Sequence, residues 1–298
     1  MNTPDRLERA VERRMAEALG TAVEVRDMRG ASGGSINRAA VLDTSVGEFF
    51  LKWNRKPIAD LFEVEAEALR EMRDSQTDLV IPEPVVATRP TGDVPAFLVL
   101  EYLAPGTRIS DFDEVLGRGL AQLHRMSAEQ FGFHSDNYCG TTPQPNAWCE
   151  DWIEFYREQR LRHQLRLAVG ERGVSRSDRR AWESLLDRLD DVLGIDPEPP
   201  ALIHGDLWSG NLHVTPEGRP SLIDPAAYYG HREAELGMMD LFGGFSDRVF
   251  AAYDEAWPLQ DGWETRIELY SLYHVLNHYN LFGGSYGQQA MSIVRNWI

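Results

Sequence analysis

Residues 204–211 read HGDLWSGN, and thirteen residues after Asn211 comes Asp224, which follows a short apolar run at 220–223. Asp206 and Asn211 have the D-x-x-x-x-N spacing of a kinase catalytic loop. Phosphoryl transfer needs a carboxylate that accepts the acceptor's hydroxyl proton, and oxygen ligands for magnesium ions that neutralise the phosphates. The segment therefore predicts Asp206 as the catalytic residue, with Asn211 and Asp224 as ligands of Mg²⁺.

The first hundred residues contain a candidate phosphate-binding lysine. Nearly all basic residues of the chain are arginines, and the only lysines are Lys52 and Lys56. Lys52 lies in an apolar segment, 47–53, where a slim ammonium can reach phosphate oxygens that a guanidinium cannot. A helix expected over 61–72 places Glu65 on its apolar face, so we predict a Lys52–Glu65 ion pair beside ATP. Glu63 is the alternative partner.

Two further segments are expected to contact the nucleotide. A glycine-rich hairpin tip contains Gly33, Gly34 and Ser35, whose backbone N–H groups could lie over phosphates, although an ordinary turn is the alternative. A buried strand over 94–102 leads to a connecting segment whose backbone could bind an adenine edge. The residues expected there are Glu101, Tyr102 and Leu103.

Periodicity predicts strands at 22–28, 37–42, 49–53 and 94–102, and helices at 4–19, 61–72, 114–126, 152–167 and 179–193. The expected class is α+β, a bilobal protein-kinase-like fold. Residues 1–101 would form a small nucleotide-binding lobe with an antiparallel sheet and a helix. Residues 102–298 would form a larger, mainly helical lobe for catalysis and substrate binding. Glycines at 117 and 119 inside a helix indicate close packing.

Several segments, taken with 204–211, resemble a known family. They are DPA at 224–226, YYGHREA at 228–234, TPQPN at 142–146, and 151–155. From about residue 20 to its end, the chain is similar to the fructosamine (ketosamine-3-) kinases, which share a superfamily with the aminoglycoside phosphotransferases. The resemblance implies an ATP- and Mg²⁺-dependent kinase that phosphorylates O3 of ketosamines such as fructosamine or ribulosamine, free or on glycated protein amines.

Residues for the acceptor follow from the same resemblance. Trp208 lies between the expected base and a metal ligand, where an indole suits a sugar face and a cationic amine; a buried core tryptophan is the alternative. His231 and Glu233 are expected to contact the substrate, with loop ordering or a surface turn as alternatives.

Glu235 stands where the family usually has Asp, which would cap a helix or tie down the catalytic loop. His204 is expected to hold the loop by a structural hydrogen bond.

Composition restricts the partners. The 298-residue chain has a formal net charge of −17, which argues against a nucleic-acid partner. No window is as apolar as a membrane span, and the charged N-terminus does not look like a signal peptide. The two cysteines, Cys139 and Cys149, are expected to be reduced thiols. We therefore expect a cytoplasmic, monomeric protein that does not bind membranes.

Two other functions are compatible with parts of the sequence. One is a kinase for an aminoglycoside, choline or another small alcohol, against which Trp208 and the 142–146 segment argue. The other is a non-catalytic regulator that binds a nucleotide. Such a protein tends to lose the core polar residues, which are all present here: Lys52, Asp206, Asn211 and Asp224.

Overall fold

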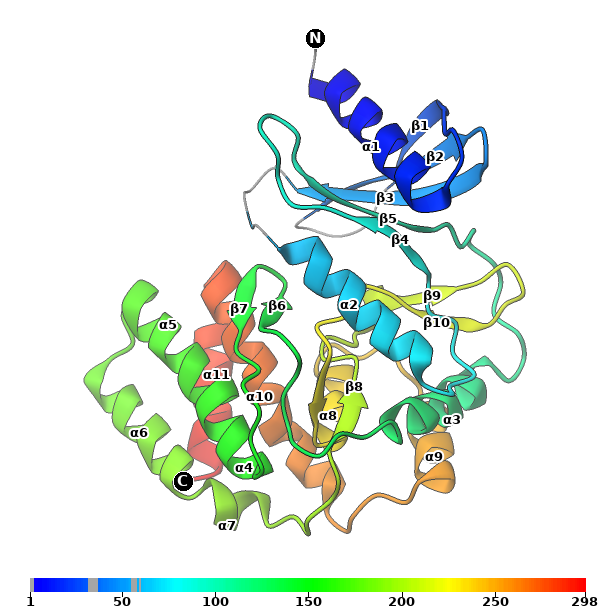
Figure 1. Ribbon diagram of the computed structural model, residues 1–298. Coiled ribbons are helices and arrows are strands. Elements are labelled where there is room, and N and C mark those ends of the chain that lie inside the picture. The colour runs from blue at the N-terminus through cyan, green and yellow to red at the C-terminus, as the bar shows by residue number, and fades with distance from the viewer. Residues whose placement is uncertain (1–2, 32–36, 55–57, 59) are drawn as a thin grey trace. The chain divides into compact units, whose positions relative to one another are not determined.

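The computed structural model describes residues 3–31, 37–54, 58 and 60–298 (Figure 1). The expected phosphate-binding tip with Gly33, Gly34 and Ser35 lies outside the described residues, as does Lys56. Contacts divide the chain into two compact units. The first comprises Met1–Asp74, Leu79–Ser110 and His213–Asp224, and the second comprises Ser75–Asp78, Asp111–Leu212 and Pro225–Ile298. The division into lobes of residues 1–101 and 102–298 stays a prediction.

The first unit is built on an antiparallel sheet of five strands in the order β1-β2-β3-β5-β4. The strands are β1 (Val25–Ala31), β2 (Arg38–Thr44), β3 (Gly47–Asn54), β4 (Pro84–Ala87) and β5 (Ala96–Glu101). Sequence periodicity predicted all of these except β4. That strand has four residues and begins with proline, so it is too short to show an alternating pattern.

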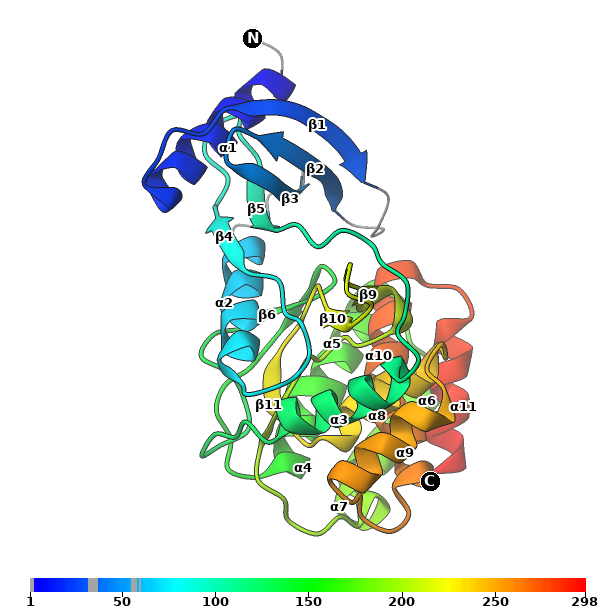
Figure 2. The same cartoon turned by 90° about the vertical axis from the view of Figure 1, so that its right-hand side faces the viewer.

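Two helices pack against the sheet of this unit (Figure 2). Apolar residues of α1 (Thr3–Leu19), including Val11 and Met15, pack against Leu42, Leu51 and Phe97 of the sheet. Helix α2 (Leu61–Asp74) contacts β4 and β5 and buries most of its length. A hairpin of β9 (Leu212–Val214) and β10 (Pro220–Leu222) then leads to Asp224.

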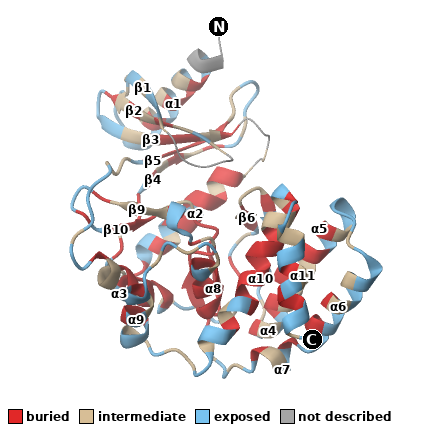
Figure 3. Ribbon diagram, turned by 180° about the vertical axis from the view of Figure 1, so that it is seen from behind, coloured by how far each residue is buried: buried red, intermediate tan, exposed pale blue. Residues whose placement is uncertain are grey.

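The second unit is mainly helical, which confirms the α+β class. Its longest helix, α10 (Trp263–Phe282), contacts α8 (Glu233–Leu241), and every residue from 269 to 277 is buried (Figure 3). The unit also contains α3 (Phe112–His124), α9 (Asp247–Ala256), α11 (Tyr286–Asn296), α6 (Arg176–Asp187) and α7 (Leu189–Leu193), of which α11 contacts α10. None of the described helices is long and apolar enough to cross a lipid bilayer.

Three segments of this unit differ from the sequence prediction. The single helix expected over 179–193 is divided at Arg188 into α6 and α7. The single helix expected over 152–167 is α4 (Trp152–Phe155), a π-helical stretch η1 (Tyr156–Arg162) and α5 (His163–Glu171). The loop expected over 133–150 contains a hairpin of β6 (Asn137–Cys139) and β7 (Thr142–Gln144), whose strands are too short to be recognised by periodicity. A third pair, β8 (Ala201–Ile203) and β11 (Tyr228–Gly230), flanks the 204–211 segment.

The close packing expected at Gly117 is confirmed. Gly117 lies where α3 meets α9, and a β-carbon there would be 2.3 Å from the carbonyl oxygen of Val249. By contrast, Gly170 in α5 is exposed and has open space around it.

We therefore expect Gly117→Ala to lower the free energy of unfolding by about 1–3 kcal/mol, because the helices must separate. Gly170→Ala is the matched control, and it should raise the same quantity by up to about 1 kcal/mol through helix propensity. Urea denaturation of both variants measures the difference. Equal effects of the two substitutions would contradict the packing argument.

Candidate active site

A buried lysine of the first unit is held by two carboxylates. Lys52 lies on β3 with 4% exposure, and its Nζ donates hydrogen bonds to Glu65 Oε1 at 2.6 Å and to Asp224 Oδ1 at 2.8 Å. The predicted Lys52–Glu65 pair is therefore confirmed. The alternative partner is wrong, because Glu63 accepts a hydrogen bond from Arg89 at the surface instead.

The electrostatics of this trio keep the lysine charged. Burial by itself would lower the pKa of Lys52, but the Asp224 and Glu65 carboxylates more than compensate, and the pKa is raised above its usual value. Burial raises the pKa of Glu65, and the Lys52 ammonium offsets only part of that increase. With both carboxylates ionised the trio carries one excess negative charge, which would attract a cation.

The backbone at Asp224 is strained. Its φ is 58°, the only positive value at a non-glycine position in the part of the chain that the structure describes. Such a conformation costs on the order of 1 kcal/mol, and aspartate tolerates it better than most residues. Strain of this kind concentrates at functional sites. It gives Asp224 a fixed orientation directly after β10, with Oδ1 bound to Lys52.

In the second unit, the 204–211 loop is held by its own polar groups. The backbone N–H of Asp206 donates to Nδ1 of the fully buried His204 at 3.3 Å, and Asn211 Nδ2 donates to the Asp206 carbonyl oxygen at 2.8 Å. The expected structural role of His204 is thus confirmed. Because the amide nitrogen of Asn211 is engaged within the loop, its Oδ1 is the atom suited to a hard cation.

Gly205 allows this loop to approach a neighbouring segment. It has φ of +78°, and a β-carbon there would lie 2.2 Å from the carbonyl oxygen of Ala226. The Ala226 N–H in turn donates to the His204 carbonyl oxygen at 2.9 Å. The 204–211 loop is therefore packed directly against the residues that follow Asp224 along the chain.

Glu235 fastens the same loop to α8. Its buried carboxylate accepts the backbone N–H of His204 and, at 3.2 Å, that of Gly205. Of the two roles expected at this position, tying down the catalytic loop is the one observed. Behind it, His124 Nε2 lies 3.7 Å from the carboxylate, and His124 Nδ1 lies 2.8 Å from the Tyr253 hydroxyl. Burial lowers the pKa of His124, an effect that Glu235 partly opposes.

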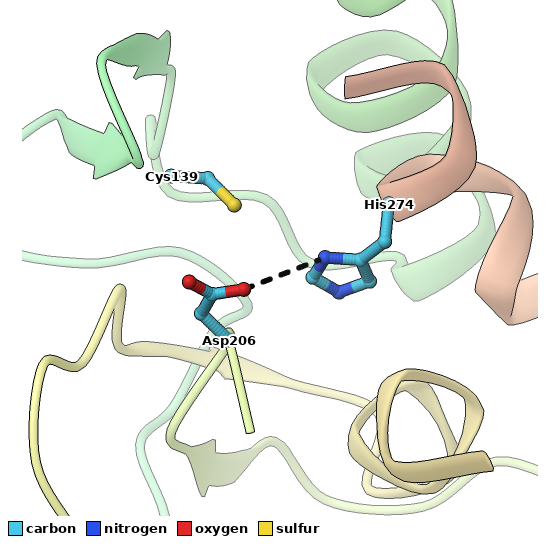
Figure 4. A group of neighbouring side chains, drawn as sticks. All are labelled: Cys139, Asp206 and His274. Carbon is cyan, nitrogen blue, oxygen red and sulfur yellow. Dashed lines mark ion pairs between the residues drawn. The ribbon is translucent and has the colours of Figure 1, made fainter. Parts of the chain in front are cut away.

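The side chain of Asp206 is 21% exposed, and a thiol and an imidazole lie beside it. His274 Nδ1 is 4.0 Å from Asp206 Oδ1, and the Cys139 thiol lies beside both (Figure 4). Burial, with smaller contributions from His278 and Arg160, lowers the pKa of His274 to about 3. The imidazole is therefore neutral at physiological pH. Sequence reasoning identified Asp206 but missed Cys139 and His274.

Trp208 presents an indole to solvent. The side chain is 40% exposed, so the buried-core alternative is wrong. The indole lies over Gly210, where a β-carbon would come within 2.2 Å of the ring. A glycine two positions after the tryptophan therefore allows the ring to lie against the loop.

The residues after Tyr228–Gly230 do not form a surface turn. Arg232 binds both carboxylate oxygens of Glu198, at 2.7 and 2.9 Å, and Glu233 binds Arg266 in the same manner, at 2.8 and 2.6 Å. His231, Arg232 and Glu233 are all nearly or fully buried. This geometry favours loop ordering. A substrate contact by His231 or Glu233 stays a prediction.

The connecting segment after β5 has backbone positions that remain candidates for the adenine. Glu101 is the last residue of β5, and its N–H donates to the Glu83 carbonyl oxygen at 2.8 Å. Tyr102 and Leu103 follow and are half-buried. Their adenine contact stays a prediction.

The 142–146 segment has a structural role that the sequence did not reveal. Gln144 Nε2 donates to the Ala226 carbonyl oxygen at 3.0 Å and to Asn137 Oδ1 at 2.7 Å, and Gln144 Oε1 accepts from the Tyr273 hydroxyl at 2.6 Å. Asn146 accepts from the fully buried Arg160. These amides therefore hold the backbone that follows Asp224. The motif was visible in the sequence, but its partners were not.

Shortening Glu235 tests its contact with the loop. Glu235→Asp withdraws the carboxylate by one methylene, so a buried N–H of His204 or Gly205 loses its acceptor. We expect a loss of about 1–2 kcal/mol in unfolding free energy. The exposed Glu255 of α9 provides the matched control, and Glu255→Asp should change stability by no more than about 0.5 kcal/mol. Chemical denaturation compares the two, and an unchanged midpoint for Glu235→Asp would contradict the proposed tie.

Comparisons with known proteins identify the family to which the chain is similar. The family model described as fructosamine kinase matches residues 7–298. The chain is 40% identical over 282 residues to the chloroplastic protein-ribulosamine 3-kinase of Oryza sativa subsp. indica, covering 94% of this chain and 81% of the rice protein. The chain is also 40% identical over 282 residues to the chloroplastic protein-ribulosamine 3-kinase of Arabidopsis thaliana, covering 94% of this chain and 85% of that protein.

Solved structures of other proteins also resemble this chain. A Thermobifida fusca protein classed as a fructosamine-3-kinase is 35% identical, with a TM-score of 0.84 over 96% of this chain and 97% of that one. A thermostable mutant of aminoglycoside phosphotransferase APH(4)-Ia, bound to AMP-PNP and hygromycin B, is 16% identical with a TM-score of 0.63, over 96% and 98% of the two chains. The predicted protein-kinase-like fold is thereby confirmed, and the chain belongs to the fructosamine kinase family.

Proposed function

We propose that this protein is an ATP- and Mg²⁺-dependent kinase that phosphorylates the O3 hydroxyl of ketosamines such as ribulosamine or fructosamine. The proposal is carried by Asp206, a carboxylate on a loop held at both ends by hydrogen bonds and with part of its side chain exposed. Family membership and relatives named protein-ribulosamine 3-kinase support the acceptor class. A structural neighbour bound to AMP-PNP supports ATP as the donor.

The residues of the first unit are assigned to the donor. Lys52 would bind phosphate oxygens, and Glu65 would hold the ammonium in place, as it does in this structure. Asn211 and Asp224 supply the oxygen donors that magnesium prefers, so their chemistry fits this ion. When bound, magnesium neutralises the phosphate charge. We assign backbone contacts with the nucleotide to Gly33, Gly34, Ser35, Glu101, Tyr102 and Leu103.

Asp206 performs the protein's part of the transfer. The acceptor O3 attacks the γ-phosphorus of ATP, the bond to the β,γ-bridging oxygen breaks, and ADP leaves. The O3 proton passes to the Asp206 carboxylate. Because phosphoryl transfer has a loose transition state, much of the benefit comes from orienting the hydroxyl. The hydrogen bonds within 204–211 and the tie to Glu235 fix the position of Asp206 for this purpose.

Trp208 is assigned to the acceptor. Its exposed indole lies two positions after Asp206, and an aromatic face attracts both the C–H face of a sugar and a cationic amine. A ketosamine has both features. We extend the proposal to glycated protein amines as acceptors and to a monomeric enzyme acting in the cytoplasm. The acidic charge of −17 makes nucleic acid an unsuitable partner.

An acceptor panel with labelled ATP tests the function. Ribulosamine, erythrulosamine and fructosamine should be phosphorylated, and hygromycin B and choline should not. Mapping the product by NMR should place the phosphate on O3. Transfer to choline or hygromycin B without transfer to any ketosamine would overturn the proposal, and the absence of transfer to every acceptor would favour a non-catalytic nucleotide-binding protein.

Replacing the proton acceptor should abolish turnover while leaving the fold intact. We expect Asp206→Asn to lower kcat by about 10²–10⁴-fold, as is typical for a lost general base, with ATP binding retained. Asp240→Asn changes an exposed aspartate of α8 and is the control for the loss of one charge. Steady-state kinetics with a ketosamine, together with nucleotide titration, measure both. A kcat within about threefold of wild type would refute the assigned role.

Removing the indole should affect one substrate only. Trp208→Ala should raise KM for the ketosamine roughly fivefold or more, since aromatic contacts contribute on the order of 1 kcal/mol, and should leave KM for ATP nearly unchanged. Trp148, which is 41% exposed compared with 40% for Trp208, provides the control variant Trp148→Ala. Equal changes in both KM values for Trp208→Ala would indicate a general structural effect instead.

A further inference from the structure

Three side chains of different ligand chemistry meet at Asp206. The Cys139 sulfur, a carboxylate oxygen of Asp206 and an imidazole nitrogen of His274 all lie within 4.8 Å of one another (Figure 4). They come from β6, the catalytic loop and α10. Thiolate, imidazole and carboxylate together form a donor set that suits a transition metal such as Zn²⁺ and does not suit Mg²⁺.

We propose that Cys139, Asp206 and His274 form an inhibitory Zn²⁺ site, in which the ion captures the carboxylate that would otherwise accept the substrate proton. The site goes beyond the proposed kinase function, since the metal here opposes catalysis. Water would fill the fourth position, as in other zinc sites with three protein ligands. On binding, the Cys139 thiol releases its proton to solvent as the sulfur–zinc bond forms.

His274 supplies evidence for a ligand that is independent of the cluster itself. The residue is 4% exposed, and its Nδ1 points toward Asp206 without a hydrogen-bond partner among the described residues. A buried polar atom of this kind loses free energy unless a partner is bound. The neutral imidazole is the form that coordinates metals, and burial keeps His274 in that form.

The geometry requires only a small contraction. His274 Nδ1 and Asp206 Oδ1 are 4.0 Å apart. Around a tetrahedral zinc with bonds of about 2.0–2.1 Å, two such atoms are about 3.3 Å apart. Asp206 is partly exposed, so its side chain can rotate to shorten this distance. The exposed part of the same side chain also gives the ion a route from solvent.

The surroundings of Cys139 have opposing effects on zinc binding. Burial and the Asp206 carboxylate raise the pKa of the Cys139 thiol, so the ion must displace its proton. Asn277 Nδ2 donates to the Cys139 sulfur at 3.2 Å, a contact that stabilises a bound thiolate. The Arg160 guanidinium is close enough to affect Cys139 and His274 electrostatically, and it repels a dication. The ionised Cys139 and Asp206 supply two negative charges, which exceed the single charge of Arg160.

Cobalt provides a direct test, because Co²⁺ can replace Zn²⁺ and its thiolate complexes absorb in the near ultraviolet. Full-length protein without nucleotide, titrated with Co²⁺, should develop this absorption at one ion per chain, and Zn²⁺ should displace it. Cys149 is the chain's other cysteine and lies outside the cluster, so Cys149→Ser should retain the absorption while Cys139→Ser loses it. His274→Gln should weaken Zn²⁺ binding by about tenfold or more, given that even groups behind the ligands contribute about 10–100-fold.

Inhibition is measured separately, with each variant referred to its own metal-free rate. At saturating magnesium and ATP, Zn²⁺ should compete with the ketosamine, and the inhibitory concentration should rise at least tenfold in Cys139→Ser and stay unchanged in Cys149→Ser. This second experiment rests on the proposed kinase function, whereas the cobalt titration does not. Absence of thiolate absorption in the wild-type protein, or its persistence in Cys139→Ser, would overturn the site whatever the enzyme's activity.

Discussion

Two backbone N–H groups at the start of the 204–211 loop depend on a single buried carboxylate. His204 and Gly205 both donate to Glu235, which lies in the first turn of α8. Glu235 is 1% exposed, so no solvent could replace it as acceptor. The loop can therefore keep its conformation only while α8 keeps its position. Helix α8 in turn packs along the fully buried part of α10, and in this way the largest core of the second unit determines where Asp206 lies.

Several charged residues are buried close to this loop. Arg232 pairs with Glu198, and Glu233 pairs with Arg266, each through two hydrogen bonds. Buried ion pairs contribute little net stability, but removing one partner is strongly destabilising. Such pairs specify one conformation of the backbone between β11 and α8. That backbone joins the segment after Asp224 to the helix that carries Glu235.

Sequence reasoning succeeded where a short-range rule applied. Glu65 was recognised because it shares a helix face with Phe62 and Leu69, and the Lys52 pair followed from the need to neutralise an inward carboxylate. Glu235 was noticed through the family resemblance alone. The Gln144 network and the Cys139–His274 neighbourhood could not be derived, because both depend on contacts between segments far apart in the sequence. The hairpin β6–β7 was missed for a different reason, since strands of three residues show no period.

His274 lies beside Asp206 without forming a salt bridge to it, because its imidazole is neutral. A protonated imidazole 4.0 Å from Asp206 Oδ1 would form a salt bridge and compete with a substrate hydroxyl. Burial in α10 prevents this by lowering the pKa of His274 to about 3, so the ring stays neutral throughout the physiological range. The same burial leaves Nδ1 without a hydrogen-bond partner among the described residues. A neutral ring forms no salt bridge with Asp206, and its nitrogen is in the form that a metal ion can bind.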